Sequence, residues 1–448
     1  MAAQGDITNH NYSHRAVGRI AAPMIVSSVT VPLLGMVDTA VMGHLDDPVF
    51  LAAVAAGATI FTVLFMGLNF LRMGTTGITA QAFGARDNDA LREALGLSLV
   101  TALALAALII VAQTLIGDAA LALLAPSDRV AQLSREYFAI RIWSAPASLC
   151  NFVLIGWLIG MQNARGPLTI MLTTNVVNIT LDLILVVVLG MQADGVALAT
   201  VLAEICGAFV GLLFVVRELR SHPGSGVPIR ILDSSAYRRL FSVNSNLFVR
   251  TMALMFVFAF ITAQGARMGD VILATNALLM NFQFFLSYAL DGIAYAAEAL
   301  VGKAVGARDR NGLLLAVRRS LQWSLLFAAG FFVAYALAGK LIIDLLSDID
   351  PLRIAAREYL PWLIVAPLIS VWSFLYDGVF VGATRSREMM VIMVGSTLLI
   401  FLPTWFGFSY LGNHGLWLAF TLFMAGRGVG MHWWFRRLVG NDAFEFSR

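Results

Sequence analysis

Charged residues are scarce in this sequence, and their scarcity excludes most soluble proteins. Only 13% of the 448 residues are charged, whereas 59% are hydrophobic. A soluble domain has about 25% charged residues, so this chain has too few to keep its apolar surface in water. The mean hydropathy of +0.81 therefore indicates a protein of the lipid bilayer, and we expect no nucleic-acid partner.

Residues that carry catalysis or hold cofactors are also lacking. The two cysteines, Cys150 and Cys206, fall in apolar runs, which excludes a disulfide framework and favours small core residues. No nucleotide-binding loop, zinc-protease, serine-hydrolase or EF-hand pattern occurs. We therefore expect no enzyme activity, no metal site and no cofactor, and an ion gradient is the remaining energy source.

What the sequence does contain is a series of long apolar segments. A membrane helix needs about 20 such residues, and backbone groups in lipid must be satisfied within the segment, which favours helices over strands. The twelve predicted spans are 16–43, 51–80, 94–117, 138–161, 168–190, 195–217, 241–263, 271–300, 320–346, 360–382, 389–411 and 415–434.

The basic residues indicate how these spans are oriented. If the N-terminus lies inside, twenty Lys and Arg residues fall on the cytoplasmic side and six on the opposite side. An excess of basic residues marks the cytoplasmic face of a membrane protein. We therefore expect both termini in the cytoplasm.

The two halves of the chain repeat each other. Gly84-Ala85-Arg86-Asp87 recurs 222 residues later as Gly306-Ala307-Arg308-Asp309, and the same offset maps Gly156 onto Gly378. Matches in register of this kind indicate an internal repeat. The polar stretch 217–239 contains Pro and Gly and is typical of a linker between the halves.

These features predict an all-α integral membrane protein. Its twelve transmembrane helices form two six-helix lobes related by a pseudo-two-fold axis along the membrane normal, because each half has an even number of spans. The predicted parts are a cytoplasmic tail 1–15, an N-lobe 16–217, a cytoplasmic linker 218–240, a C-lobe 241–435 and a cytoplasmic tail 436–448. Parallel repeats are typical of secondary transporters, which bind substrate between the repeats.

Polar residues inside the N-lobe spans are candidates for function, because an ionisable group there costs about 2.5–3.5 kcal/mol on insertion scales. At 1.5 Å per residue, the carboxylates and Thr200 lie about 8–14 Å from the outer helix ends, so they share one layer. Residues four apart share a helix face. The predicted network consists of Asp38, Asn151, Asn175, Asn178, Asp182, Thr200 and Glu204.

Burial and a second carboxylate nearby favour the protonated form, so we predict that Asp38 and Asp182 bind and release a proton. The alternative is a polar network that only packs the helices, and Glu204 in particular suits a structural bond. Pro23 and Pro32 each remove a backbone hydrogen bond, so we expect helix 1 to bend near Asp38. A plain kink without switching is the alternative.

The C-lobe has a different polar set, consisting of Arg250, Asp291, Glu298 and Asp377. Asp291 and Glu298 are seven residues apart and share a helix face. Arg250 requires a carboxylate partner within the membrane, for which we favour Asp291. The set is interpreted either as structural pairing near the cytoplasmic side or as direct handling of substrate or protons.

These residues resemble the multidrug and toxic compound extrusion (MATE) family of transporters, and within it the DinF-like branch. The resemblance covers residues 16–435. It rests on the repeated turn at 84–87, the stretch 175–182, the run 195–200, Arg250-Thr251, the run 288–292 and Glu298.

The resemblance implies that Asp38 is the carboxylate of proton coupling, that Asn178, Asp182, Thr200 and Asn151 surround it, and that helix 1 bends at Pro23. The resemblance also implies that sodium-coupled relatives have a glutamate in span 7. This chain has Arg250 at the corresponding place. Proton coupling is therefore favoured over sodium, even though Asp377 resembles the span-10 partner of that glutamate.

The expected function is proton-coupled antiport, which exports small organic compounds that are cationic or amphipathic. We expect a monomer in a bacterial cytoplasmic membrane. The alternatives are sodium-coupled efflux by the same fold, and a lipid or oligosaccharide flippase of the same superfamily. The acidic residues of the N-lobe argue against a flippase, because such proteins usually have a cationic cavity.

Overall fold

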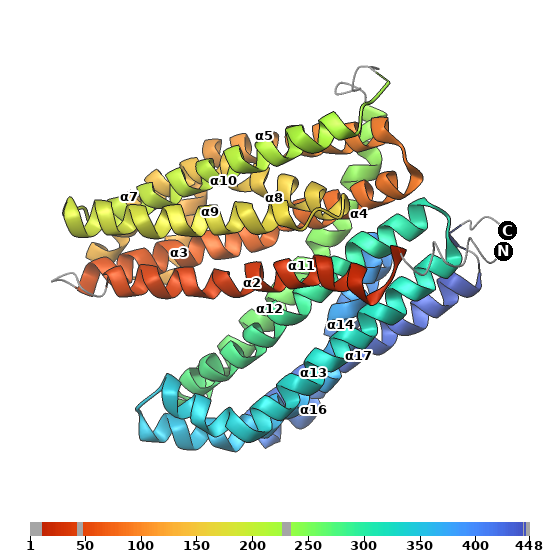
Figure 1. The fold of residues 1–448 in the computed structure, drawn as a ribbon. Helices are drawn as coiled ribbons and strands as arrows, with labels where there is room; N and C mark the ends of the chain where they lie inside the picture. The colour runs from red at the N-terminus through yellow and green to blue at the C-terminus, as the bar shows by residue number, and fades with distance from the viewer. Residues whose placement is uncertain (1–10, 43–47, 226–233, 442, 445–448) are drawn as a thin grey trace. The chain divides into compact units, whose positions relative to one another are not determined.

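The computed structural model describes residues 11–42, 48–225, 234–441 and 443–444, and the side chains of 31–42, 48 and 234–236 lie outside the description. Every described element of secondary structure is a helix (Figure 1). The predicted all-α fold is confirmed.

The first half of the chain forms helices that cover the first six predicted spans. They are α2 (His14–Met42), α3 (Pro48–Leu68), α4 (Phe70–Ala85), α5 (Asn88–Val111), α6 (Gln113–Leu124), α7 (Asp128–Arg141), the 3-10 turn η1 (Ile142–Ser144), α8 (Ala145–Gly160), α9 (Arg165–Asp182), the π-helix η2 (Leu183–Val188) and α10 (Ala193–Ser221).

The second half covers the remaining six spans with longer helices. They are α11 (Ser234–Arg267), α12 (Asp270–Gly306), α13 (Arg310–Leu346), α14 (Asp350–Gly382), α15 (Ser386–Ser396), the π-helix η3 (Thr397–Phe401), α16 (Leu402–Phe408), the 3-10 turn η4 (Ser409–Leu411) and α17 (Asn413–Gly440).

The lengths of these helices suit a membrane. Among the described residues, ten helical stretches are long and apolar enough to cross one. The helices α2 and α17 have 29 and 28 residues, more than the roughly 20 that a span requires.

Cys206 is exposed on α10, so the expectation of a small core residue was wrong there. Its neighbours Ile205 and Phe209 are 50% and 63% exposed, as on a surface that faces lipid.

The chain divides into two compact units. The N-terminal unit consists of Val26–Phe241, and the C-terminal unit consists of Ser242–Arg448 together with the residues up to Ile25. The division therefore falls inside α2, two residues after Pro23. This helix contributes its first half to one unit and its second half to the other.

The repeated tetrapeptide forms the same turn in both units. Arg86 and Arg308 have φ angles of 57° and 54°, a left-handed conformation that is uncommon for residues other than glycine. Asp87 and Asp309 follow them and cap the next helix, and each accepts a hydrogen bond from the backbone N–H three residues on, at 2.9 and 2.8 Å. The sequence repeat is thus a structural repeat.

The repeated glycines lie where two helices of one unit cross. An added Cβ at Gly156 of α8 would collide with the backbone carbonyl oxygen of Arg72 in α4, and one at Gly378 of α14 would collide with that of Ala294 in α12. Both pairs are related by the 222-residue offset. Glycine is needed at these crossings because it lets two helix backbones approach closely.

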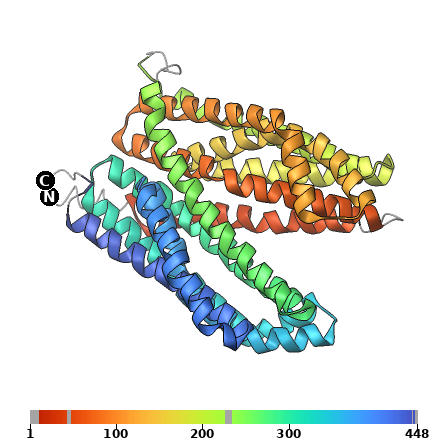
Figure 2. The ribbon, with the colours of Figure 1, turned by 180° about the vertical axis from the view of Figure 1, so that it is seen from behind.

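In the C-terminal unit, α11 lies along the segment formed by α15, η3 and α16. Figure 2 shows this from behind, with α11 in green and the segment in blue. Asn246 Nδ2 donates to Ser386 Oγ at 3.3 Å, and the Phe260 ring lies 5.4 Å from that of Phe401. An aromatic core fixes this helix pair, since edge-to-face ring contacts add to the burial of apolar area.

The segment before α2 is anchored in the C-terminal unit. Tyr12 is 3% exposed, and the ammonium of Lys303 lies 5.9 Å from the centre of its ring. His14 Nε2 lies 2.5 Å from Arg319 Nη1. Burial raises the pKa of the Tyr12 hydroxyl, and the negative charge of Asp309 acts in the same direction.

Candidate substrate and coupling site

A polar cluster joins α9 and α10 in the N-terminal unit. Asn178 and Asp182 are 1% and 0% exposed, and being four residues apart they share one face of α9. The Asn178 amide lies 3.3 Å from Thr200 Oγ1. The side-chain amide of Asn178 has one orientation in which both its nitrogen and its oxygen find partners. In this orientation the nitrogen donates to Asp182 Oδ2 at 3.0 Å and the oxygen accepts from Thr200. The structure thus brings these three residues together.

A second pair lies one turn further along α10. Asn151 of α8 is 4% exposed, and its Nδ2 donates to Glu204 Oε2 at 2.7 Å and to the Glu204 backbone carbonyl at 3.0 Å. The 2.7 Å separation lies at the short end of the normal range for N–H···O hydrogen bonds. Glu204 therefore ties α8 to α10, which is the structural bond that the sequence left as an alternative.

Two contacts join α2 to α9. Ser27 Oγ donates to Met171 Sδ at 2.6 Å, and Asn175 Nδ2 donates to Thr30 Oγ1 at 2.9 Å. The residue numbers on both helices rise together from one contact to the next. Because of this, α2 and α9 run parallel here, with an offset of 144 to 145 residues between the partners.

The register of α2 and α9 sets the level of the predicted proton site. If the offset continues, position 38 of α2 lies level with Asp182, about two helical turns beyond the Thr30 contact. The side chains of Asp38 and Pro32 lie outside the described residues. The helix α2 runs through Pro23 and Pro32 without interruption.

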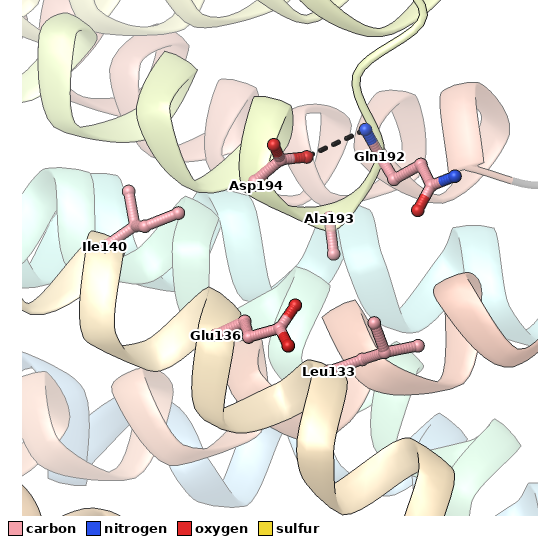
Figure 3. A pocket seen from close by; sticks show the side chains of 6 residues that line it. All are labelled: Leu133, Glu136, Ile140, Gln192, Ala193 and Asp194. Atoms are coloured by element: carbon pink, nitrogen blue, oxygen red, sulfur yellow. Dashed lines mark hydrogen bonds between the residues drawn. The ribbon is translucent and has the colours of Figure 1, made fainter.

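An acidic pocket lies at the start of α10, on a part of the surface that sequence reasoning missed. The cavity of about 380 Å³ is lined by residues of α7 and of the segment that leads into α10, and Figure 3 shows the carboxylates of Glu136 and Asp194 there. Asp194 Oδ1 accepts a hydrogen bond from the backbone N–H of Gln192 at 2.9 Å. Glu136 and Asp194 both fall between predicted spans. Charged residues are common in such connections, so the sequence did not mark these two as candidates.

The C-terminal unit contains a buried cluster of different charge. Asp377 of α14 accepts hydrogen bonds on Oδ2 from Nη2 of Arg250 in α11 and, at 2.8 Å, from Nη2 of Arg427 in α17. The side chains of the two arginines are only 8% and 3% exposed. The prediction favoured Asp291 as the partner of Arg250, whereas the hydrogen-bonded carboxylate is Asp377. Arg427 was not among the candidate residues predicted from the sequence. The feature that could have identified it is that it is the one charged residue in the predicted span 415–434.

The other two acids of the C-lobe set lie on α12. Asp291 is half-buried, and its Oδ2 accepts from Ser287 Oγ at 3.4 Å. Its charge also acts on Arg427. Glu298 is 3% exposed, and its backbone carbonyl abuts Gly382 where α12 and α14 cross. Asp291 is thus within electrostatic range of Arg427 in the Asp377 cluster, whereas the Glu298 backbone lies at the crossing of α12 and α14.

The described residues contain no group of three or more His, Cys, Asp or Glu side chains arranged to hold a metal ion. The polar groups instead form pairs and triads inside helix bundles. Ionisable groups inside membrane spans generally pair with one another or line substrate and ion pathways.

Comparison with known proteins assigns this chain to a class of transporters. The MatE family model matches residues 23–184 and 247–406, which is most of both halves. The chain therefore belongs to the MatE family of multidrug and toxic compound extrusion transporters, and it is a multi-pass membrane transporter rather than an enzyme.

Two relatives illustrate the similarity. The chain is 45% identical over 431 residues to DNA damage-inducible protein F of Escherichia coli, covering 94% of this chain and 93% of that protein. It is 26% identical over 439 residues to a protein of Rhodopseudomonas palustris named probable multidrug resistance protein NorM, covering 94% and 91%. The predicted relation to the DinF branch is confirmed.

Solved structures share the fold. An outward-facing multidrug resistance MATE family transporter superposes with a TM-score of 0.87 at 20% identity, covering 98% of this chain and 99% of that one. The Vibrio cholerae MATE transporter VcmN in its bent form gives 0.86 at 19% identity, covering 98% and 100%. At these identities the likeness shows the fold alone.

Proposed function

We propose that the protein is a proton-coupled antiporter that exports organic compounds of cationic or amphipathic character. The observation that carries the proposal is the fully buried Asp182, held by Asn178 beside Thr200. A carboxylate removed from water binds a proton more readily than an exposed one. Position 38 of α2 is level with Asp182 if the offset between α2 and α9 continues, and we assign the Asp38 carboxylate to the same layer on that basis.

The proposed exchange is competition for these carboxylates. A proton that neutralises Asp38 or Asp182 removes the electrostatic attraction for a bound organic cation, and α2 then rearranges relative to α9 and α10. Release of the proton on the other side restores the site. Each pH unit supplies about 1.4 kcal/mol per proton, and a potential of 100 mV supplies about 2.3 kcal/mol per charge.

The C-terminal unit supports protons over sodium as the coupling ion. Asp377 already has two guanidinium groups on one carboxylate oxygen. A carboxylate neutralised by two internal cations offers little attraction to a sodium ion. We therefore assign the cluster of Arg250, Asp377 and Arg427 a role in holding α11, α14 and α17 together.

We also propose the setting that the basic residues favour. Both termini and the linker 218–240 lie in the cytoplasm of a bacterial cell, and the protein works in the cytoplasmic membrane as a monomer. Under this orientation, export runs from the side of the repeated 84–87 turn to the side where α10 begins.

The test uses purified protein reconstituted into sodium-free vesicles with an imposed pH gradient. We expect ethidium to move against the proton flow with the unchanged protein. We expect gradient-driven transport to fall at least tenfold with Asp38→Asn and several-fold with Asp182→Asn, because neither asparagine can carry the proton.

Asp348→Asn is the matched control, because Asp348 is fully exposed and pairs with Arg353 on the surface. It should transport as the unchanged protein does. Undiminished gradient-driven transport by Asp38→Asn would refute the role of that residue. Transport that requires a sodium gradient and ignores the pH gradient would refute proton coupling.

A further inference from the structure

A groove between α14 and α17 lies on the surface of the C-terminal unit. Its cavity of about 390 Å³ falls in the range of about 300–1,000 Å³ that small-molecule sites occupy. Leu368 and Val429 on its walls are 40% and 70% exposed, so the groove is open along its side. The lining residues are Leu368, Ile369, Trp372, Ala425, Gly428, Val429 and His432.

The groove changes from apolar to polar along its length. Six of its seven lining residues are glycine or have uncharged side chains. The seventh, His432, lies at the end nearer the C-terminus of α17. His432 Nδ1 lies 2.6 Å from the hydroxyl of Tyr376. Arg436 is one turn further, exposed, and its charge acts on both His432 and Tyr376.

The polar end of the groove lies where a membrane surface is expected. Trp433 is 57% exposed, and the guanidinium of Arg437 lies 5.6 Å from the centre of its ring. Exposed tryptophan beside arginine is typical of the boundary between hydrocarbon and headgroups. The apolar part of the groove is then at the depth of acyl chains, and His432 and Arg436 are at the depth of phosphates.

The N-terminal unit has a smaller apolar cavity, two of whose walls, α8 and α10, correspond by the repeat to α14 and α17. A cavity of about 220 Å³ between α5, α8 and α10 is lined by Leu99, Leu103, Pro146, Ala147, Cys150, Leu154, Ala208 and Leu212. The 222-residue offset maps Trp372 onto Cys150. Gly195 and Ala199 recur as Gly415 and Ala419, an offset of 220.

This second offset applies to α10 and α17, and it maps His432 onto Leu212 and Arg436 onto Val216. At these two positions the C-terminal groove therefore has a hydrogen-bonding residue and a cation, whereas the N-terminal cavity has two apolar residues. Packing alone gives no reason for the difference, since the apolar version also fills its place in the fold.

We propose that the groove between α14 and α17 binds one anionic phospholipid. An acyl chain lies along Leu368, Trp372 and Val429, and the phosphate lies at His432 and Arg436. When the Tyr376 hydroxyl donates to Nδ1, a neutral His432 has its proton on Nε2 and can donate it to a phosphate oxygen. The Arg436 guanidinium adds charge-assisted hydrogen bonds of the type that favours phosphate. The proposal does not depend on the coupling ion or the exported compound.

The experiment is native mass spectrometry of the full chain in detergent, titrated separately with phosphatidylglycerol and phosphatidylcholine. The unchanged protein should retain one phosphatidylglycerol more tightly than phosphatidylcholine. Arg436→Val should weaken phosphatidylglycerol binding about fivefold, which corresponds to one basic residue facing an anionic lipid. His432→Leu by itself should weaken phosphatidylglycerol binding more than Arg436→Val does. Each substitution introduces the residue found at the corresponding position of the N-terminal repeat, Leu212 or Val216.

Two further variants separate the site from general effects. Arg267→Val removes an exposed arginine at the far end of α11 and should leave binding unchanged. Val429→Trp fills the open side of the groove without touching the polar end and should abolish the tight binding of phosphatidylglycerol. Thermal unfolding of every variant, followed by tryptophan fluorescence, verifies that the fold is retained.

Three outcomes would overturn the proposal. One is equal retention of the two lipids by the unchanged protein. Another is a loss with Arg267→Val as large as the loss with Arg436→Val. The third is displacement of the bound lipid by ethidium at concentrations that saturate transport, which would make the groove a substrate site.

Discussion

At the scale of single residues, two of the described acids inside the helix bundles are met by hydrogen-bond donors from other helices. Asp377 accepts from two arginines of different helices, and Glu204 accepts from Asn151. Leaving one buried charge without its partner is much more costly than breaking an exposed ion pair. Such residues therefore hold helices together even where they take no part in transport.

The Asp377 cluster provides a direct test of this cost. We expect Asp377→Ala to lower the free energy of unfolding by about 3–5 kcal/mol, because two buried guanidinium groups lose their carboxylate. The control is Asp344→Ala, which removes partly exposed pairs with Arg357 and Arg353 and should cost about 0–1 kcal/mol per pair. Thermal unfolding in detergent compares the two, and similar midpoints would contradict the assignment.

At the scale of helices, close crossings depend on glycine. The backbone carbonyls that face Gly156 and Gly378 belong to neighbouring helices and cannot rotate away as a side chain does. The two units have the same crossing at the same place in the repeat. A methyl group at either position must therefore push two helices apart.

Gly378→Ala tests the crossing in the C-terminal unit. Overpacking of this type typically costs about 1–3 kcal/mol, so the thermal midpoint should fall. Gly395→Ala is the matched control, because that glycine also lies in a helix but an added Cβ meets nothing within 4 Å. It should leave stability unchanged or raise it by up to about 1 kcal/mol. A fall of equal size in both variants would rule out the crossing as the cause.

The anchor at Tyr12 predicts a dependence of stability on pH. Burial raises the pKa of Tyr12 above its ordinary value of about 10, and Asp309 adds to the effect. The unfolded chain therefore loses the Tyr12 proton first as the pH rises, and stability falls above about pH 10.

We expect the unfolding midpoint to drop more steeply between about pH 9 and pH 11 for the unchanged protein than for Tyr12→Phe. The phenylalanine keeps the ring over Lys303 but has no proton to lose. Parallel curves for the two proteins would show that the ionisation of Tyr12 does not contribute. Below about pH 9 the ionisation has no effect on either protein.

At the scale of the whole molecule, the orientation in the membrane stays a prediction from the basic residues. It is tested with single cysteines in a chain whose Cys150 and Cys206 are replaced by alanine. Asp348→Cys, at a fully exposed position just before α14, should react with an impermeant maleimide added to intact cells. Asn441→Cys, exposed after α17, should react only after the membrane is opened. The reverse pattern would invert the proposed direction of export.

Much of the fold follows from the sequence alone. The spans, their helical state and the repeat come from local composition, because a bilayer requires about 20 apolar residues per span and internal hydrogen bonds. The grouping of Asn178, Asp182 and Thr200 follows from spacing and depth, which are local quantities along a helix.

Partners between helices were decided by the tertiary structure. Periodicity gives the face and depth of a residue but not which neighbouring helix lies opposite it, so Arg250 was assigned to Asp291 although it bonds to Asp377. The same reason hid Arg427, the acidic pocket at Glu136 and Asp194, and the groove at His432. Each depends on side chains from segments far apart in the chain, and only packing brings such segments together.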